Sequence, residues 1–262
     1  MTASQTKIIF TATFLLLFFL TSFGWAADFS DLVSKRVSQD GKTLDLSGLN
    51  IGASGAKQLA KMDLLAGITA LHLQGNNIRA RGMKALAKSP HLAGLKHIDL
   101  WGNLLGDLGL KAISESPYLK QLETLKLWKN EISDDSIELM VVSGNFTHLK
   151  ILMLNDNLIT PAGAAMLAST SLFPQLLTLN LFSNDIGDGG ALAFASSKNF
   201  SSLELLYLGE NKITDQGAVT LIESQYFPRL KVLDLAMNPL GEATMMAAFK
   251  VNNKGKLQIV YR

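Results

Sequence analysis

A single period of 27 residues runs through this chain and limits what it can fold into. Steps of that length reach an aliphatic residue nine times: Leu44, Leu71, Ile98, Leu125, Leu152, Leu179, Leu206, Leu233 and Val260. Two residues later the chain carries Leu eight times: Leu46, Leu73, Leu100, Leu127, Leu154, Leu181, Leu208 and Leu235. No insertion or deletion interrupts this spacing. The sequence therefore predicts one unit that repeats along an axis and buries its apolar face against its neighbours.

An asparagine recurs at a fixed place in seven of these units: Asn76, Asn103, Asn130, Asn157, Asn184, Asn211 and Asn238. In the stretch LETLKLWKNEI, residues 122–132, Leu125 and Leu127 alternate as in a short strand, and Asn130 falls where the strand turns away. Such a turn leaves buried backbone N–H and C=O groups unpaired unless a side-chain amide bonds to them. We therefore predict that the seven asparagines form a structural ladder.

The second half of each unit has the pattern of a helix. Met83, Leu86 and Ala87 are apolar at helical spacing. Thr160 before Pro161 predicts an N-cap followed by proline at the first helical position. Short strands that alternate with helices predict an α/β solenoid, with a parallel β-sheet on its concave face and helices on its convex face.

The repeated pattern L-x-x-L-x-L-x-x-N-x-[IL] resembles the leucine-rich repeat family over about residues 41–262. The long helical half and the period of 27 resemble its ribonuclease-inhibitor-like class. The resemblance implies a horseshoe-shaped scaffold that recognises a protein or peptide, has no enzymatic activity and needs no cofactor. With it we expect an N-terminal cap over residues 27–42 and a repeat domain over 43–262, made of eight repeats and a terminal strand.

The first 26 residues have the order of a secretory signal: Lys7, an apolar segment over 8–20, and small residues at Gly24 and Ala26. We expect cleavage after Ala26 and a secreted or periplasmic protein; the alternative is an uncleaved membrane anchor.

The sequence has no Cys, which excludes disulfides, thiolate metal sites and a Cys nucleophile. A net charge of +2 argues against a nucleic-acid partner bound through bulk charge.

Strand side chains that alternate with the core leucines are expected on the concave face. Trp101 and Trp128 take equivalent places in adjacent units, and Phe182 continues their row after Asn155. The predicted partner-binding residues are Trp101, Trp128, Phe182, Tyr207, Met153, Lys126, Asp99 and His72. Exposed aromatic side chains favour a protein or peptide partner. One alternative is a cell-wall glycan, since aromatic rings also stack on sugars. Another is that the two indoles only stack on each other and shield the sheet.

His72, His97 and Asp99 are expected on adjacent strands of the same face, where such groups can bind a metal or move a proton. No third His and no recognisable nucleophile accompany them, so we predict neither a metal site nor a catalytic site. A regulatory or enzymatic role is the least favoured alternative.

Two N-x-[S/T] sequons, at Asn145 and Asn199, fall on the outer side, and the sequence leaves their use open.

Overall fold

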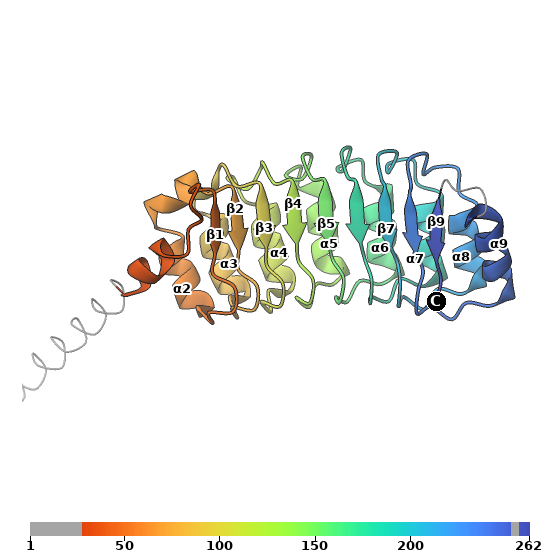
Figure 1. Ribbon diagram of the computed structural model, residues 1–262, viewed down its shortest axis with the longest axis horizontal. Coiled ribbons are helices and arrows are strands. Elements are labelled where there is room, and N and C mark those ends of the chain that lie inside the picture. Colours follow the sequence, from red (N-terminus) through yellow and green to blue (C-terminus); the bar gives the residue numbers. More distant parts are fainter. Residues whose placement is uncertain (1–27, 253–256) are drawn as a thin grey trace, which may run out of the picture.

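The structure, a computed structural model, describes residues 28–252 and 257–262, so the expected signal segment 1–26 lies outside the described residues. Figure 1 shows one sheet whose strands follow one another in chain order, with helices behind it. The strands are β1 (Thr43–Asp45), β2 (Ala70–His72), β3 (His97–Asp99), β4 (Thr124–Lys126), β5 (Ile151–Met153), β6 (Thr178–Asn180), β7 (Leu205–Tyr207), β8 (Val232–Asp234) and β9 (Gln258–Val260). All pairs of neighbouring strands are parallel.

A helix follows each strand from β1 to β8 and packs on the helix of the next unit. These helices are α2 (Gly52–Leu59), α3 (Arg79–Ala87), α4 (Gly106–Ser114), α5 (Asp134–Val142), α6 (Pro161–Ser169), α7 (Gly187–Ala195), α8 (Asp215–Ile222) and α9 (Glu242–Asn252). Two short 3-10 helices, Asp63–Gly67 and Pro90–Leu92, lie in the connections after α2 and α3. The predicted α/β solenoid, with a parallel sheet in one layer and helices in the other, is confirmed.

The register of the sheet follows the leucines. From β1 to β8, each pair of strands joins residues 27 apart, as where Leu125 lies opposite Leu152. The last pair differs, because Leu233 lies opposite Ile259. Ile259 is buried and Val260 is half-buried, so the prediction that Val260 takes the core position is wrong. One residue fewer separates the final two strands, which turns Ile259 towards the core.

Glycine near the start of several helices lets consecutive helices approach closely. A Cβ atom added at Gly190 would lie 2.7 Å from the Cβ of Ala164, and one added at Gly217 would lie 2.9 Å from the Cβ of Ala191. Any larger residue there would push α7 away from α6, or α8 away from α7. This contact gives a packing reason for the glycine in the helical half of the unit.

The ladder asparagines bond to the backbone of two successive turns, as Asn130 shows. Its Nδ2 donates to the carbonyls of Leu100 and Leu127, at 2.9 and 3.0 Å. Its Oδ1 accepts from the N–H groups of Asn103 and Leu105, at 3.1 and 3.2 Å. Each side chain therefore links its own turn to the turn of the preceding unit. These bonds satisfy buried backbone groups that helix and strand leave free.

Two further rows of hydrogen bonds tie the helices together. At the N-terminal ends, a carboxylate bonds to the next unit: Asp188 accepts from the backbone N–H and hydroxyl of Thr214 at 2.8 and 2.7 Å. At the C-terminal ends, a serine hydroxyl donates to a carbonyl of the preceding helix; the donors are Ser89, Ser116, Ser197 and Ser224. The predicted N-cap is confirmed, since the Thr160 side chain accepts from the N–H of Ala162 and Pro161 begins α6.

Both ends of the stack are covered. Phe29 and Val33, from a helical turn at 28–34, are buried in the core at the first unit. At the other end, β9 bonds to β8 through Gln258 and Val260, which leaves the backbone groups of Ile259 at the open edge. The Asn252 side chain pairs with both: its Oδ1 accepts from Ile259 N at 2.7 Å and its Nδ2 donates to Ile259 O at 3.2 Å.

Candidate binding face on the sheet

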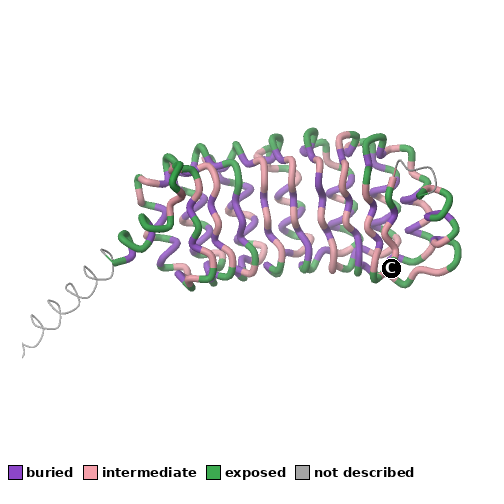
Figure 2. The backbone as a smooth tube through the Cα atoms, in the orientation of Figure 1, coloured by how far each residue is buried: buried purple, intermediate pink, exposed green. Residues whose placement is uncertain are grey.

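The candidate site is the sheet face that the helices leave open. Along most strands a buried residue alternates with half-buried ones, which Figure 2 shows as alternating colours on the tubes. The half-buried side chains belong to this face, because successive side chains of a strand point to opposite sides. The face is polar over β1 to β4 and largely apolar over β5, β7 and β8.

The most distinctive contact of this face is a pair of stacked indoles. The ring centroids of Trp101 and Trp128 are 4.9 Å apart, and their planes differ by 28°. They follow β3 and β4, whose parallel register places them side by side. Trp101 remains 38% exposed and Trp128 is half-buried. The rings therefore stack on each other and still present apolar surface to solvent.

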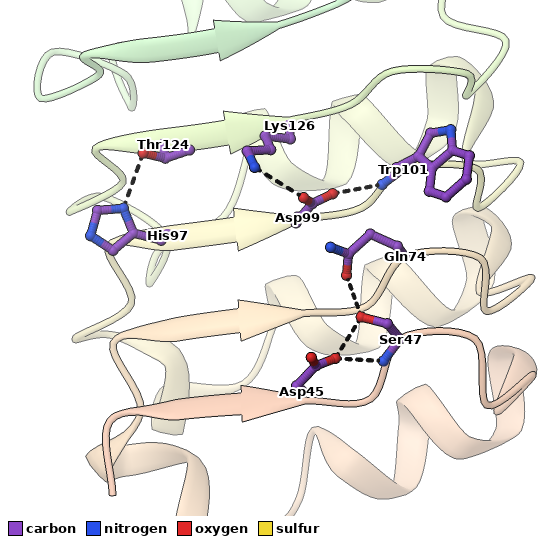
Figure 3. A network of polar contacts seen from close by, with 8 residues as sticks. All are labelled: Asp45, Ser47, Gln74, His97, Asp99, Trp101, Thr124 and Lys126. Atoms are coloured by element: carbon purple, nitrogen blue, oxygen red, sulfur yellow. Dashed lines mark hydrogen bonds and ion pairs between the residues drawn. The ribbon is translucent and has the colours of Figure 1, made fainter. Parts of the chain in front are cut away.

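A buried carboxylate supports this pair (Figure 3). Asp99 accepts from the backbone N–H of Trp101 at 3.2 Å and pairs with the Lys126 ammonium at 3.3 Å. Only 7% of Asp99 is exposed, so little of this predicted partner-binding residue is accessible to a partner. Its role in the structure is to hold the turn before Trp101 and to orient Lys126 on the next strand.

The two histidines of this face have separate environments. His97 is exposed, and its Nδ1 lies 3.0 Å from the Thr124 hydroxyl oxygen (Figure 3). His72 lies opposite Asp45 on one side and opposite Asp99 on the other. The hydroxyl and backbone N–H of Ser47 lower the pKa of Asp45, with a smaller effect from His72. Within residues 28–252 and 257–262, no three His, Asp or Glu side chains are grouped to hold a metal ion.

The second half of the face is a separate apolar patch. Met153 and Tyr207 are half-buried there, on β5 and β7. The Phe182 ring lies over Gly209, where an added Cβ would come within 2.4 Å of its Cε2. Asn155 occupies the equivalent place between Trp128 and Phe182 and is buried. The aromatic residues thus form two groups, one at the indole pair and one at Phe182, and not one continuous row.

The turns after the strands form a rim that includes Lys129, Asp156 and Glu210, which the sequence predicts as polar side chains beside the sheet face. The residue before each ladder asparagine has a positive φ. It is Gly75 before Asn76 and Gly102 before Asn103, and Gly48 takes the same place before Leu49 in the first unit. Later units place larger side chains there: Lys129, Asp156, Ser183, Glu210 and Met237. Such residues strain the backbone, since the left-handed conformation costs a non-glycine residue about 1–2 kcal/mol.

The rim holds a hollow of about 500 Å³. It is lined by exposed Leu158 and Met237, together with Glu210 and the ion pair of Lys212 with Asp185 at 2.8 Å.

A row of charges runs along the other edge of the sheet, where the strands begin. Glu123 pairs with Lys150 at 2.7 Å and with Lys96 at 3.0 Å. The hydrogen bonds from these two ammonium groups, first that from Lys150, lower the pKa of Glu123 to about 2. Lys231 and Glu204 form a similar pair at 2.6 Å. The acids at this edge are therefore neutralised by neighbouring strands.

The sequon asparagines are used inside the fold. Asn145 Nδ2 donates to the carbonyls of Ser114 and Ser116 at 2.7 and 2.8 Å. Asn199 Nδ2 donates to the carbonyl of Ala168 at 3.1 Å. A glycan attached to either nitrogen would remove or distort these bonds, so both asparagines have a structural role.

In the described part of the chain, no helix combines the length and the apolarity needed to cross a bilayer.

A comparison with protein families finds leucine-rich repeats in part of the chain. Four segments match a protein-family model described as Leucine Rich repeat: residues 68–87, 147–168, 174–195 and 201–221. No curated protein matches the chain. Among solved structures, it is similar to an internalin (inlF) from Listeria monocytogenes, with 19% identity, a TM-score of 0.45, and coverage of 80% of this chain and 65% of that one.

A second similar structure is the LRR ectodomain of the plant membrane receptor kinase GASSHO1/SCHENGEN3 from Arabidopsis thaliana, in complex with CASPARIAN STRIP INTEGRITY FACTOR 2. It has 18% identity and a TM-score of 0.41, and the match covers 78% of this chain and 24% of that one. The chain therefore spans less than two thirds of the length of either protein.

Proposed function

We propose that this chain, which carries leucine-rich repeats, is a non-catalytic scaffold that binds a protein or peptide on its open sheet face. The Trp101–Trp128 stack is the proposed anchor, and Lys126 and His72 supply polar contacts beside it. Met153, Phe182 and Tyr207 form the second contact area. Asp99 acts through the two residues it holds, and we do not assign it a direct contact with the partner.

The observation that carries this proposal is the geometry of the indole pair. Two large aromatic rings are held against each other at 4.9 Å, and the outer one remains 38% exposed. Aromatic side chains that are already fixed lose little conformational freedom when a partner covers them, so they favour tight binding per unit of buried area. The stacking of the two rings supports this fixation, and Asp99 holds the backbone of Trp101.

We also propose that residues 1–26 direct export, with cleavage after Ala26, and that the repeats belong to the ribonuclease-inhibitor-like class. Support for export comes from Lys7, the apolar segment and the small residues before the cleavage site. Support for the class comes from helices of eight to eleven residues in every unit. Mass spectrometry of the N-terminus of protein recovered from the native cell tests the first proposal.

The binding proposal is tested with purified protein as bait in its native cell extract, after mild cross-linking. Wild type is compared with the variant Trp101→Ala/Trp128→Ala. We expect recovery of the partner to fall at least tenfold in that variant. Phe249→Ala is the matched control, since Phe249 is exposed at 66% but lies on α9. Equal recovery by all three baits would exclude the indole pair as the site.

A titration separates the partner classes. Tryptophan fluorescence is followed while the recovered protein, synthetic peptides from it, or cell-wall glycan fragments are added. The proposal expects a change with the protein or its peptide. A saturable response to glycan alone, absent in Trp101→Ala/Trp128→Ala, would replace the proposed partner by a carbohydrate.

A further inference from the structure

The helical face has an uneven charge distribution that the proposed function does not use. Six exposed cations on and next to helices α2 and α3 form no ion pair within the described residues: Lys57, Lys61, Arg79, Arg81, Lys84 and Lys88. Helix α3 contains no Asp or Glu. By contrast, five lysines of the sheet and its turns each pair with a carboxylate: Lys96, Lys126, Lys150, Lys212 and Lys231. The first helices therefore carry positive charge without internal compensation.

A groove lies between α3 and α4 within this charged region. Its volume is about 530 Å³. Arg81, Lys84 and Lys88 line it from α3, and Lys111 lines it from α4. Alanines and Leu108 supply its apolar surface, and Leu108 is 69% exposed. We call it the α3–α4 groove.

The α3–α4 groove combines an apolar floor with cationic walls. Its single acid, Glu115, sits at the end of α4, 3.8 Å from Lys111. Alanines in the floor allow a third element to approach the two helices closely. A ligand that fits must therefore be narrow, apolar along one side and negatively charged along its flanks.

We propose that the α3–α4 groove binds an acidic amphipathic helix of a partner protein. Its apolar stripe lies along the alanines and Leu108, and its Asp or Glu side chains pair with Arg81, Lys84 and Lys88. This is helix-in-groove recognition, in which apolar anchors give affinity and charges give orientation. The surface belongs to the helical layer, so it is independent of the proposed site on the sheet.

A bilayer is a poorer fit to this region. Peripheral binding to anionic lipid needs basic and large apolar side chains on one shared surface. Among the described residues, the other strongly exposed apolar side chains of the helical layer are Val142 on α5 and Met246 and Phe249 on α9. Those helices carry acids in their first turns and lack the cluster of cations. Leu108 lies with four cations, Arg81, Lys84, Lys88 and Lys111, and it borders a groove.

The test uses a labelled synthetic peptide with Leu at helical spacing and Glu on both flanks, and a scrambled peptide of the same composition. Fluorescence anisotropy is measured with the full chain. We expect micromolar binding of the amphipathic peptide and at least tenfold weaker binding of the scrambled one. Lys84→Glu/Lys88→Glu is expected to weaken binding at least tenfold. Lys57→Glu/Lys61→Glu, which changes the net charge equally on the neighbouring helix, is expected to change it less than threefold.

Two further variants make the result specific. Ala112→Trp fills the groove without changing charge and is expected to prevent binding, provided its urea midpoint shows that it folds. Trp101→Ala/Trp128→Ala is expected to bind the peptide as wild type does, so failure of the sheet site and failure of the groove are distinguished.

Three results would overturn the proposal. One is equal weakening by the two charge reversals, and another is equal binding of the scrambled peptide. The third is binding only to phosphatidylglycerol vesicles.

Discussion

At the scale of single residues, the asparagine ladder has a direction. Asn76 bonds to the carbonyl of Leu46 and accepts from the N–H of Ile51, both in the preceding unit. The amide therefore completes the turn before its own. In the first unit Leu49 stands at the equivalent place, and residues 28–42 before it form no strand–turn–helix unit for an amide to complete. A half-buried Leu packs on the core there instead.

Replacement of Asn130 by Ala removes three donor contacts and two acceptor contacts, all to backbone groups. Unpaired buried backbone groups cost about 1–3 kcal/mol each, and entry of water recovers part of that. We expect the free energy of unfolding to fall by about 3 kcal/mol in urea titrations. The control Asn155→Ala loses one bond of 3.3 Å to Asp156 and is expected to lose less than about 1 kcal/mol. Equal losses would contradict the role of the ladder.

Sequence reasoning succeeded for side chains that bond to backbone groups of a turn or of a helix start. The position of Asn130 and the N-cap of Thr160 followed from local pattern alone. It failed for Asp99, whose burial depends on Lys126 reaching across from the next strand. It also missed the bonds between Asp188 and Thr214, since a carboxylate in the first turn of a helix is equally compatible with solvent exposure.

At the scale of elements, the row of charges before the strands makes stability depend on pH. In the folded protein the pKa of Glu123 is about 2, below its ordinary value of 4.5. The folded state thus binds this proton less readily than the unfolded state does. The stabilisation is fully present above about pH 4.5 and is lost as the pH falls towards 2.

The comparison of wild type with Glu123→Gln isolates this effect. We expect wild type to be more stable by about 1 kcal/mol at pH 6, since partly exposed pairs are screened, and the difference to approach zero near pH 2. Urea titrations across this range measure it. Glu138→Gln is the control, because Glu138 is exposed on α5 and forms no ion pair in the described part of the chain. A difference that is constant with pH would contradict the assignment.

The open edge of β9 is protected by one side chain. Asn252 pairs with the N–H and C=O of Ile259, where a further strand would otherwise bond. In Asn252→Ala we expect a loss of about 1–2 kcal/mol and self-association that increases with concentration. Sedimentation velocity and urea titration measure the two effects. Lys250→Ala, on the same helix, is expected to behave as wild type, and an unchanged Asn252→Ala would show that the edge needs no cap.

The last strand also marks where periodicity misled the sequence analysis. A spacing of 27 gave Val260 the core position, whereas Ile259 takes it. Both are β-branched aliphatic residues, so composition could not choose between the two registers. A shift by one residue exchanges the faces of a strand, and the buried position decided which register formed.

At the scale of the whole molecule, each unit packs on its neighbours in the chain. Stability in such a stack is approximately the sum of unit and interface terms, so a complete unit should be removable. Deletion of residues 130–156 joins Lys129 to Asn157 and leaves Asp107 facing Thr160 where it faced Ser133. We expect a folded protein with one cooperative transition and an m-value reduced roughly in proportion to its length.

The control deletion removes residues 130–155, so that Asp156 stays in the chain between Lys129 and the ladder asparagine Asn157. That turn then contains one residue too many, and we expect a loss of several kcal/mol or failure to fold. Circular dichroism and urea titration compare the two deletions. If both behaved alike, the units would not need to be equal in length, and the stacking model would be wrong.

The backward reach of the amides also restricts how the stack can be rearranged. An interior unit can follow any other unit, because its asparagine supplies the side-chain amide that bonds to the turn of the unit before it. The first unit has no ladder asparagine. A second copy of it in the middle of the stack would therefore leave the turn of the preceding unit without these hydrogen bonds. Recombination can therefore lengthen or shorten this protein internally, but its beginning is not interchangeable with the rest.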